Sequence, residues 1–235
     1  MTTPIRVLVV DDSAFVRKVV TEMLNRSDAV EVVGFARDGE EALELVERLQ
    51  PDVITLDLVM PRMNGVEFLR TQNRRRRIPV VVCSIAHESG EMALEAFEAG
   101  AIEFVQKPTA LATDRVYEIA AELVAKVRAA AAAVLAQEPA PAVAPAVAPA
   151  VAAQAAPSRE GPAGFGERRC DVVVLGISTG GPQALRQLIP ELPADLPVPV
   201  VMVLHMPVGY TEMYAQRLDA LAALNVREAR EGDDW

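Results

Sequence analysis

The amino-acid sequence predicts an α/β protein in two parts: a complete domain of five βα units, then a linker and the beginning of a second parallel α/β domain. Two observations support this prediction. Short apolar segments alternate with amphipathic segments along residues 1–128, and the same alternation resumes in residues 169–235. By the rules for strand connections, repeated βα units form a parallel sheet that helices cover on both faces.

The first domain, residues 1–128, is predicted to contain five strands and five helices in alternation. Each predicted strand is a short run rich in Val, Ile and Leu, which is typical of parallel strands buried on both faces. Each predicted helix repeats apolar residues every three or four positions. The predicted strands are Arg6–Val10, Glu31–Phe35, Val53–Leu56, Val80–Cys83 and Glu103–Val105. The predicted helices are Ala14–Asn25, Gly39–Leu49, Asn64–Gln72, Glu91–Ala99 and Asp114–Arg128.

An Ala/Pro/Val repeat dominates residues 129–168. Its prolines recur every few residues and it carries few charges, so it can neither build a core nor continue a helix. The composition predicts a flexible, semi-extended linker at ~3 Å per residue. A helix that continues from the first domain is compatible with the sequence only as far as about Leu135.

The second domain, residues 169–235, begins with a strand at Val172–Leu175 and a helix that includes Ala184–Leu188. A second strand at Val198–Leu204 and an amphipathic helix at Thr211–Leu224 follow. Two strands are too few to complete a parallel sheet that is buried on both faces. We therefore expect this segment to be only part of a domain.

Composition and charge argue against nucleic-acid binding, membrane insertion and cysteine-based metal or redox sites. The chain has 235 residues and a formal net charge of −10, which opposes non-specific binding to nucleic acid or anionic membrane. Its two cysteines, Cys83 and Cys170, have neither metal-ligand nor redox spacing, and we expect free thiols in a reducing compartment. No signal peptide or membrane-length apolar run is visible, so a soluble cytoplasmic protein without direct membrane insertion is expected.

Polar side chains follow four of the five strands in the first domain. Asp11 and Asp12 come after the first, Asp57 after the third, Ser84 after the fourth and Lys107 after the fifth. The carboxyl ends of parallel strands share one edge of the sheet, where ligands bind. Three carboxylates brought together need a cation, and all-oxygen ligation suits Mg²⁺. With a lysine and a hydroxyl nearby, the cluster predicts a site that accepts a phosphoryl group.

A serine flanked by glycines follows the first strand of the second domain. The segment "GISTG" fits G-x-S-x-G, in which a tight strand-to-helix turn exposes the hydroxyl of Ser178. A serine needs a base to remove its proton, and the chain has two histidines. His87 belongs to a loop of the first domain. His205 ends the next strand after Ser178, so the two side chains are expected to lie close together.

Three segments of the first domain resemble the receiver domain of two-component response regulators, a flavodoxin-like fold: "VLVVDDSAFVRK", "DVITLDLVMPRMNGVEFL" and "GAIEFVQKP". The resemblance implies that a histidine kinase phosphorylates Asp57. It further implies that Asp12 and Asp57 bind Mg²⁺ directly, Asp11 binds it through water, and the main chain of Val59 supplies another ligand. Three residues would carry the conformational switch: Ser84, Phe104 and Lys107. Phe104 lacks the hydroxyl of an aromatic switch residue such as tyrosine.

"GISTGGPQAL" and "LHMP" behind a receiver resemble the chemotaxis response regulator protein-glutamate methylesterases, the CheB family, whose second domain is Rossmann-like. The resemblance implies a serine-type ester hydrolase, without an esterase cofactor, in which Ser178 is the nucleophile and His205 the base. Thr179 would help to form the oxyanion hole. The implied substrates are methylated glutamates of methyl-accepting chemoreceptors, with glutamine deamidation as a companion activity. A chemotaxis histidine kinase would donate the phosphoryl group.

The sequence departs from this family in one respect. The third member of a catalytic triad should be an aspartate in a Met-Gly-x-Asp-Gly-like context, which this chain does not contain. We therefore expect the chain to be incomplete at its C-terminus and to have negligible esterase activity alone. The alternative is a non-catalytic phospho-receiver that binds partners. The acids after His205 are Glu212, Asp219, Glu228, Glu231, Asp233 and Asp234.

Two other functional classes fit less well. A DNA-binding response regulator needs a basic recognition helix, but residues 170–235 contain four arginines and no lysines against nine acids. A nucleotide site at "GISTGG" lacks the Walker lysine and the second glycine of the dinucleotide pattern. The four arginines at 74–77 form the densest basic run and are expected to lie in a solvated turn.

Overall fold

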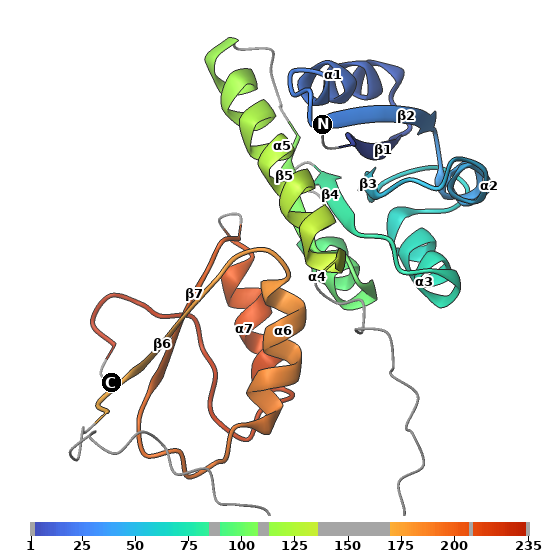
Figure 1. Cartoon of the computed structure of the whole chain (residues 1–235). Coiled ribbons are helices and arrows are strands. Elements are labelled where there is room, and N and C mark those ends of the chain that lie inside the picture. The colour runs from blue at the N-terminus through green and yellow to red at the C-terminus, as the bar shows by residue number, and fades with distance from the viewer. Residues whose placement is uncertain (1–2, 85–89, 108–112, 136–169, 207–208, 234–235) are drawn as a thin grey trace, which may run out of the picture.

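The structure is a computed structural model that describes residues 3–84, 90–107, 113–135, 170–206 and 209–233. It contains a five-stranded and a two-stranded parallel sheet, each with its own helices. Figure 1 shows the helices of the two-stranded sheet on the side that faces the larger domain. Among the described residues, no helix is long and apolar enough to cross a membrane.

The five predicted strands of the first domain are confirmed and form one parallel sheet in the order β2-β1-β3-β4-β5. Within the register, Val10 pairs with Leu56, so the acids that follow these residues leave the sheet side by side. The strands are β1 (Ile5–Val10), β2 (Val30–Ala36), β3 (Val53–Leu56), β4 (Val80–Ser84) and β5 (Glu103–Gln106).

The five predicted helices are also present, and two of them end later than predicted. One runs to Arg75 rather than Gln72, which places two of the four consecutive arginines on an exposed helix end. The last runs to Leu135 rather than Arg128, because its extension is rich in alanine, the strongest helix former. The helices are α1 (Ala14–Leu24), α2 (Gly39–Leu49), α3 (Gly65–Arg75), α4 (Gly90–Ala99) and α5 (Thr113–Leu135).

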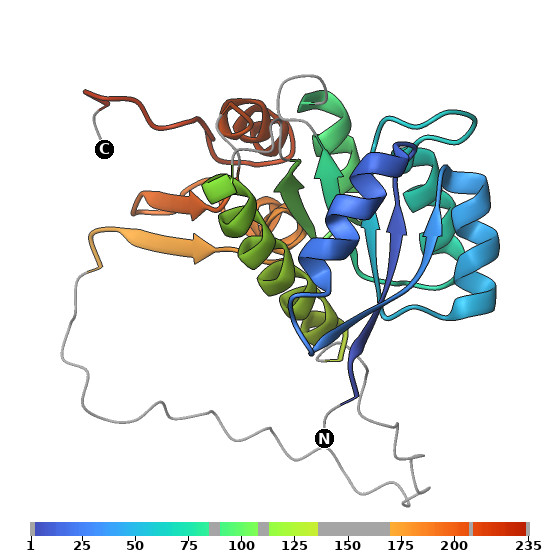
Figure 2. The ribbon, with the colours of Figure 1, turned by 90° about the horizontal axis from the view of Figure 1, so that it is seen from above.

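Successive side chains of a strand point to opposite faces of the sheet, so the apolar residues of the receiver-like domain form two core clusters, one on each face. Leu8 and Val10 belong to the cluster covered by α2, α3 and α4, whereas Val7 and Val9 belong to the cluster covered by α1 and α5. Figure 2 shows these two groups of helices on opposite sides of the sheet. The sheet is therefore buried on both faces, as the sequence predicts.

The second domain contains the two predicted strands, but its two main helices have different limits from those predicted. The first begins at Gly181 rather than near Ala184, because Pro182 is well placed in a first helical turn. The last ends at Asp219 rather than Leu224; the Asp219 carboxylate accepts the N–H of Val226, which folds the chain back. The elements are β6 (Val173–Ile177), α6 (Gly181–Leu188), η1 (Ile189–Glu191), β7 (Val200–Leu204) and α7 (Thr211–Asp219).

Among the residues that the structure describes, helices cover one face of the two-stranded sheet. On that face Leu185, Ile189 and Leu218 are fully buried, and Leu94 of α4 joins the same cluster. The opposite face exposes Val174 and Val203, which are 62% and 60% accessible. The described part of the second domain thus buries one face of its sheet and leaves valines of the other exposed.

Candidate functional sites

Three carboxylates converge at the carboxyl edge of the five-stranded sheet, as predicted. Oxygen atoms of Asp11, Asp12 and Asp57 all lie within 4.8 Å of one another. The Nζ atom of Lys107 lies 2.6 Å from Asp11 Oδ2 and 2.7 Å from Asp57 Oδ2. Asp12 is exposed, whereas the other two acids are buried. One lysine thus neutralises part of a cluster that opens to solvent at Asp12.

Burial makes this cluster electrostatically unfavourable for Asp57. Desolvation raises the pKa of the Asp57 carboxyl, and Lys107 only partly offsets that effect. Burial alone would lower the pKa of Lys107, but the charge of Asp57 and the hydrogen bonds to both acids outweigh it, so that pKa is raised. A divalent cation would relieve the carboxylate repulsion. The donor set, carboxylates with an exposed side open to water, fits Mg²⁺.

The other predicted residues of this site lie around the acids. Val59 follows β3, and its N–H donates to Asp57 Oδ1 at 3.4 Å. Ser84 and Phe104 are both 3% accessible, and the Lys107 N–H donates to the carbonyl oxygen of Ser84 at 2.9 Å. The strand ends therefore bring Ser84 and Lys107 to the same edge of the sheet as the acids, whereas Phe104 lies within β5.

The loops of this site are held by contacts that the sequence analysis did not predict. Arg62, at a positive φ of 65°, forms an ion pair with the buried carboxylate of Asp38 at the start of α2. The N–H of Gly39 donates to the Met63 carbonyl oxygen at 3.1 Å. Gly65 lies so close to β3 that a Cβ atom there would be 2.4 Å from the Asp57 carbonyl oxygen. The segment "MPRMNG" indicates a turn in the sequence. The partner of its arginine could not be predicted, because that partner lies in another loop.

The G-x-S-x-G turn follows β6 and the histidine follows β7, and these adjacent strands end at paired residues. Ile177 pairs with Leu204, so Ser178 and His205 are the next residues of two adjacent strands. The His205 N–H donates to the Ile177 carbonyl oxygen at 3.3 Å. Both Ser178 and His205 are exposed. This register agrees with the prediction that the side chains of Ser178 and His205 lie close together.

The turn after Ser178 has the conformation that the glycines suggest. Gly180 caps α6 at a φ of +74°, a left-handed conformation that favours glycine. The N–H of Gly181 donates to the Ser178 carbonyl oxygen at 2.9 Å. Thr179 lies between Ser178 and this cap, so its amide belongs to the tight turn that adjoins the serine. Such a turn suits a nucleophile with an oxyanion donor beside it.

The first domain contacts the second beside this turn. The N–H of Gly180 donates to the carbonyl oxygen of Ile102 at 3.1 Å, and Gln183 Nε2 donates to that of Ala101 at 3.0 Å. This contact lies next to the serine, and the side chains of Ser178 and His205 stay exposed.

Apolar and charged contacts extend the same interface. The rings of Phe104 and Tyr210 have centroids 5.7 Å apart, and both residues are 3% accessible. One carboxylate oxygen of Glu98 on α4 lies 2.9 Å from Arg186 of α6 and 2.6 Å from Arg217 of α7. The predicted switch residue Phe104 is therefore part of the contact between the domains.

Most of the described acids after His205 contact other groups. Glu212 pairs with Arg230 at 2.8 Å, and Glu228 accepts the hydroxyl of Thr211. Asp233 lies 3.8 Å from Arg227. Glu231 is exposed, and Asp234 lies outside the described residues, as does His87. Within the described part of the chain, no acid completes a triad with His205.

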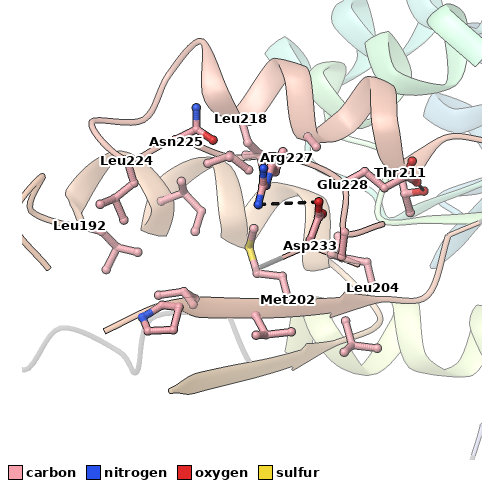
Figure 3. Close-up of a pocket in the computed structure, with 18 of the residues that line it drawn as sticks. Leu192, Met202, Leu204, Thr211, Leu218, Leu224, Asn225, Arg227, Glu228 and Asp233 are labelled. Atoms are coloured by element: carbon pink, nitrogen blue, oxygen red, sulfur yellow. Dashed lines mark hydrogen bonds and ion pairs between the residues drawn. The ribbon is translucent and has the colours of Figure 1, made fainter. Parts of the chain in front are cut away.

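A groove of about 820 Å³ runs along β7, between this strand, α7 and residues 224–233. Figure 3 shows Leu192, Met202 and Leu218 lining it, with the ion pair of Arg227 and Asp233 at its side. Its lining excludes Ser178, His205 and the acid cluster. The groove is mainly an apolar extension of the second domain's core rather than part of either predicted site.

Comparison with known proteins supports both halves of this description. Residues 7–117 match the family model "Response regulator receiver domain", and residues 173–235 match "CheB methylesterase". The first domain is similar to the crystal structure of the response regulator domain of Thermotoga maritima CheB. The two share 40% sequence identity at a TM-score of 0.51, over 55% of this chain and 98% of that chain.

Named relatives extend the similarity over nearly the whole chain. A protein-glutamate methylesterase/protein-glutamine glutaminase of Myxococcus xanthus is 52% identical over 98% of this chain and 63% of its own length. A Bacillus subtilis protein of the same name is 44% identical over 97% of this chain and 64% of its own length. The chain therefore spans less than two thirds of these relatives. It belongs to the CheB family, in which a response regulator receiver domain is joined to a methylesterase domain.

Proposed function

We propose that this protein is a protein-glutamate methylesterase and glutaminase, controlled by phosphorylation, that acts on chemoreceptors during chemotactic adaptation. The observation that carries the proposal is the register of β6 and β7, which sets Ser178 beside His205 at the edge of a domain that touches a receiver. The net charge of −10 agrees with a cytoplasmic protein that neither enters the membrane nor binds nucleic acid.

The receiver is proposed to accept a phosphoryl group at Asp57 from a chemotaxis histidine kinase. Asp12, Asp57 and the Val59 carbonyl oxygen would hold Mg²⁺ directly, and Asp11 would hold it through water. The cation supplies charge neutralisation for the incoming phosphoryl oxygens. Lys107, already within hydrogen-bonding distance of Asp57, would then contact the phosphoryl group.

The proposed ester hydrolysis follows from a serine and a histidine at one sheet edge. His205 would take the hydroxyl proton as the Ser178 oxygen attacks the ester carbonyl. The Thr179 N–H would stabilise the negative oxygen of the tetrahedral intermediate. Collapse of this intermediate releases methanol, which takes the proton from His205. A water molecule, deprotonated by His205, then attacks the acyl-serine; collapse of the second intermediate returns this proton from His205 to the Ser178 oxygen and releases glutamate.

Control is proposed to act through the interface beside Ser178. The receiver engages the N–H of Gly180 and packs Phe104 against Tyr210. In the proposal, a receptor helix has to approach the exposed serine past this contact. Phosphorylation would change the packing around Ser84 and Phe104, and a population with separated domains would grow. We expect removal of residues 1–135 to raise the activity of a family member that has a complete esterase domain.

Phosphorylation of Asp57 is tested with acetyl phosphate and Mg²⁺. The wild-type chain should gain one phosphoryl group, measured as a mass increase in an intact-protein spectrum. Asp57→Asn should gain none, because the amide cannot form the acyl phosphate. Asp52→Asn, an exposed aspartate at the opposite end of the sheet, is the control and should label like the wild type. Equal labelling of Asp57→Asn would overturn the assignment.

The esterase proposal is tested by methanol release from methylated receptor. The assay uses this chain alone and the same chain joined to the part of the Myxococcus xanthus relative that it does not cover. We expect negligible release from the chain alone and turnover by the fusion. Ser178→Ala, His205→Gln and their double variant should each reduce this turnover by about 10⁴-fold or more, since residues of one catalytic unit are not additive. Phosphorylation without methanol release from any form would favour a non-catalytic binding module.

A further inference from the structure

Arg17, on the first turn and a half of α1, contacts the acid cluster through the main chain. Its Nη1 atom donates to the carbonyl oxygen of Asp11 at 2.7 Å and to that of Asp12 at 3.0 Å. Arg17 is neither fully buried nor fully exposed. Its guanidinium thus binds the backbone that carries two predicted metal ligands.

These two carbonyl groups lie in the turn between a strand and a helix. The last carbonyl oxygen of β1, on Val10, accepts the N–H of Asp57, and the Ser13 carbonyl oxygen accepts the N–H of Arg17. The carbonyl groups of Asp11 and Asp12 lie between these points, beyond the strand ladder and before the helix. Backbone acceptors at such positions need side-chain donors or water. Arg17 supplies a donor to both from a single nitrogen.

The turn also sets the direction of the acids. The Asp11 Oδ1 atom accepts the N–H of Ser13 at 2.9 Å, which ties that carboxylate to the same turn. Asp12 is exposed, so packing does not fix its orientation. A turn held at both carbonyl groups has less freedom to carry the Asp12 carboxylate away from Asp57. Groups that orient metal ligands in this way commonly change metal affinity by about 10–100-fold.

We propose that Arg17 is a positioning residue of the phosphoacceptor site: by binding the carbonyl oxygens of Asp11 and Asp12, it holds their carboxylates ready for a divalent cation. This inference rests on the proposed binding of Mg²⁺ by the acid cluster. Arg17 does not itself touch the cation or the phosphoryl group. Its effect is on the affinity for the cation, and the acceptor chemistry of Asp57 is unaffected once the cation is bound.

The competing role for Arg17 is that of a simple positive charge, and it predicts the opposite sign. A cationic side chain near an acid cluster repels Mg²⁺, so its removal would tighten Mg²⁺ binding. A positioning residue stabilises the geometry of binding, so its removal weakens Mg²⁺ binding. The direction of the change in affinity therefore separates the two roles.

The experiment measures Mg²⁺ affinity of the full chain by isothermal titration calorimetry, for the wild type, Arg17→Ala, Arg17→Lys and Lys18→Ala. Lys18 is the matched control, because it is the next residue, carries the same charge, is exposed and pairs only weakly with Glu22 at 3.9 Å. We expect about tenfold weaker binding by Arg17→Ala, an intermediate loss for Arg17→Lys and wild-type affinity for Lys18→Ala. At saturating Mg²⁺, Arg17→Ala should label with acetyl phosphate as fast as the wild type.

Each other outcome has a definite meaning. Unchanged or tighter binding by Arg17→Ala overturns the positioning role. Slow labelling of Arg17→Ala at saturating Mg²⁺ also overturns it, since that result assigns Arg17 to the chemical step. Wild-type protein that binds no Mg²⁺ would overturn the proposed cation site itself. If Arg17→Ala fails to fold by circular dichroism, the Arg17→Lys affinity decides, because this variant keeps the charge and loses the planar fork.

Discussion

The two domains obey the same local rules and differ in what covers their sheets. In the receiver, helices lie on both faces, and Val81 of β4 is completely buried. In the second domain, helices lie on one face, and Val203 of β7 is 60% accessible. Val80–Cys83 of β4 and the whole of β7 are uninterrupted apolar runs, the pattern of parallel strands that are buried on both sides. The difference teaches that a strand's sequence specifies its pairing, whereas its burial depends on the layer packed against it.

The largest expected difference between the domains comes from a matched pair of Val→Ala substitutions. Val81→Ala removes two buried methyl groups from the receiver core and should lower the free energy of unfolding by about 2 kcal/mol. Val203→Ala removes an exposed side chain and should change it by less than about 0.5 kcal/mol. Urea denaturation followed by far-UV circular dichroism measures both. Equal losses would show that the open face of β7 is covered in solution.

A smaller effect is expected at the joint between the domains. Glu98 forms ion pairs with two arginines of the second domain, whereas Glu95 of the same helix forms one with Arg70 of the receiver. Glu98 and its two arginine partners are about one third exposed, so removing the Glu98 charge should cost only about 1 kcal/mol. Glu98→Gln should therefore speed hydrogen exchange of the α6 amides about fivefold.

Glu95→Gln is the control for that measurement and should leave α6 exchange unchanged. A similar increase in both variants would indicate a general loosening of α4. No increase in Glu98→Gln would mean that the apolar contacts of Leu94 and Tyr210 hold the joint without help from the ion pairs.

The smallest expected effect is tested by chemical labelling of the two cysteines, which reports their burial without a substitution. Cys83 in β4 is buried, and desolvation raises the pKa of its thiol to about 12, so it holds almost no reactive thiolate at neutral pH. Cys170, just before β6, is exposed. Ellman's reagent should titrate one thiol in the native chain and two in denaturant. Two fast native thiols would contradict the tight packing of the receiver.

Most of the fold was predictable because its signals are local. The strand ends, the helix caps and the parallel order follow from short runs of sequence, and the acids at the strand ends follow from that order. Two helix ends differed from the prediction: the alanine-rich extension carries α5 past Arg128, and α7 ends early at Asp219, whose carboxylate binds the N–H of Val226. The pairs of Arg62 with Asp38 and of Glu98 with two arginines were not predictable, since each joins distant segments through tertiary packing.

The hydrogen bonds beside Ser178 have a consequence for how freely this joint can vary. On the receiver side, the acceptors are the carbonyl oxygens of Ala101 and Ile102, which every amino acid possesses. A side-chain replacement at either position leaves these acceptors in place. Substitutions in this loop can thus change the strength of the contact between the domains through the side chains around it. The two backbone acceptors that hold the loop against the serine turn remain through such substitutions.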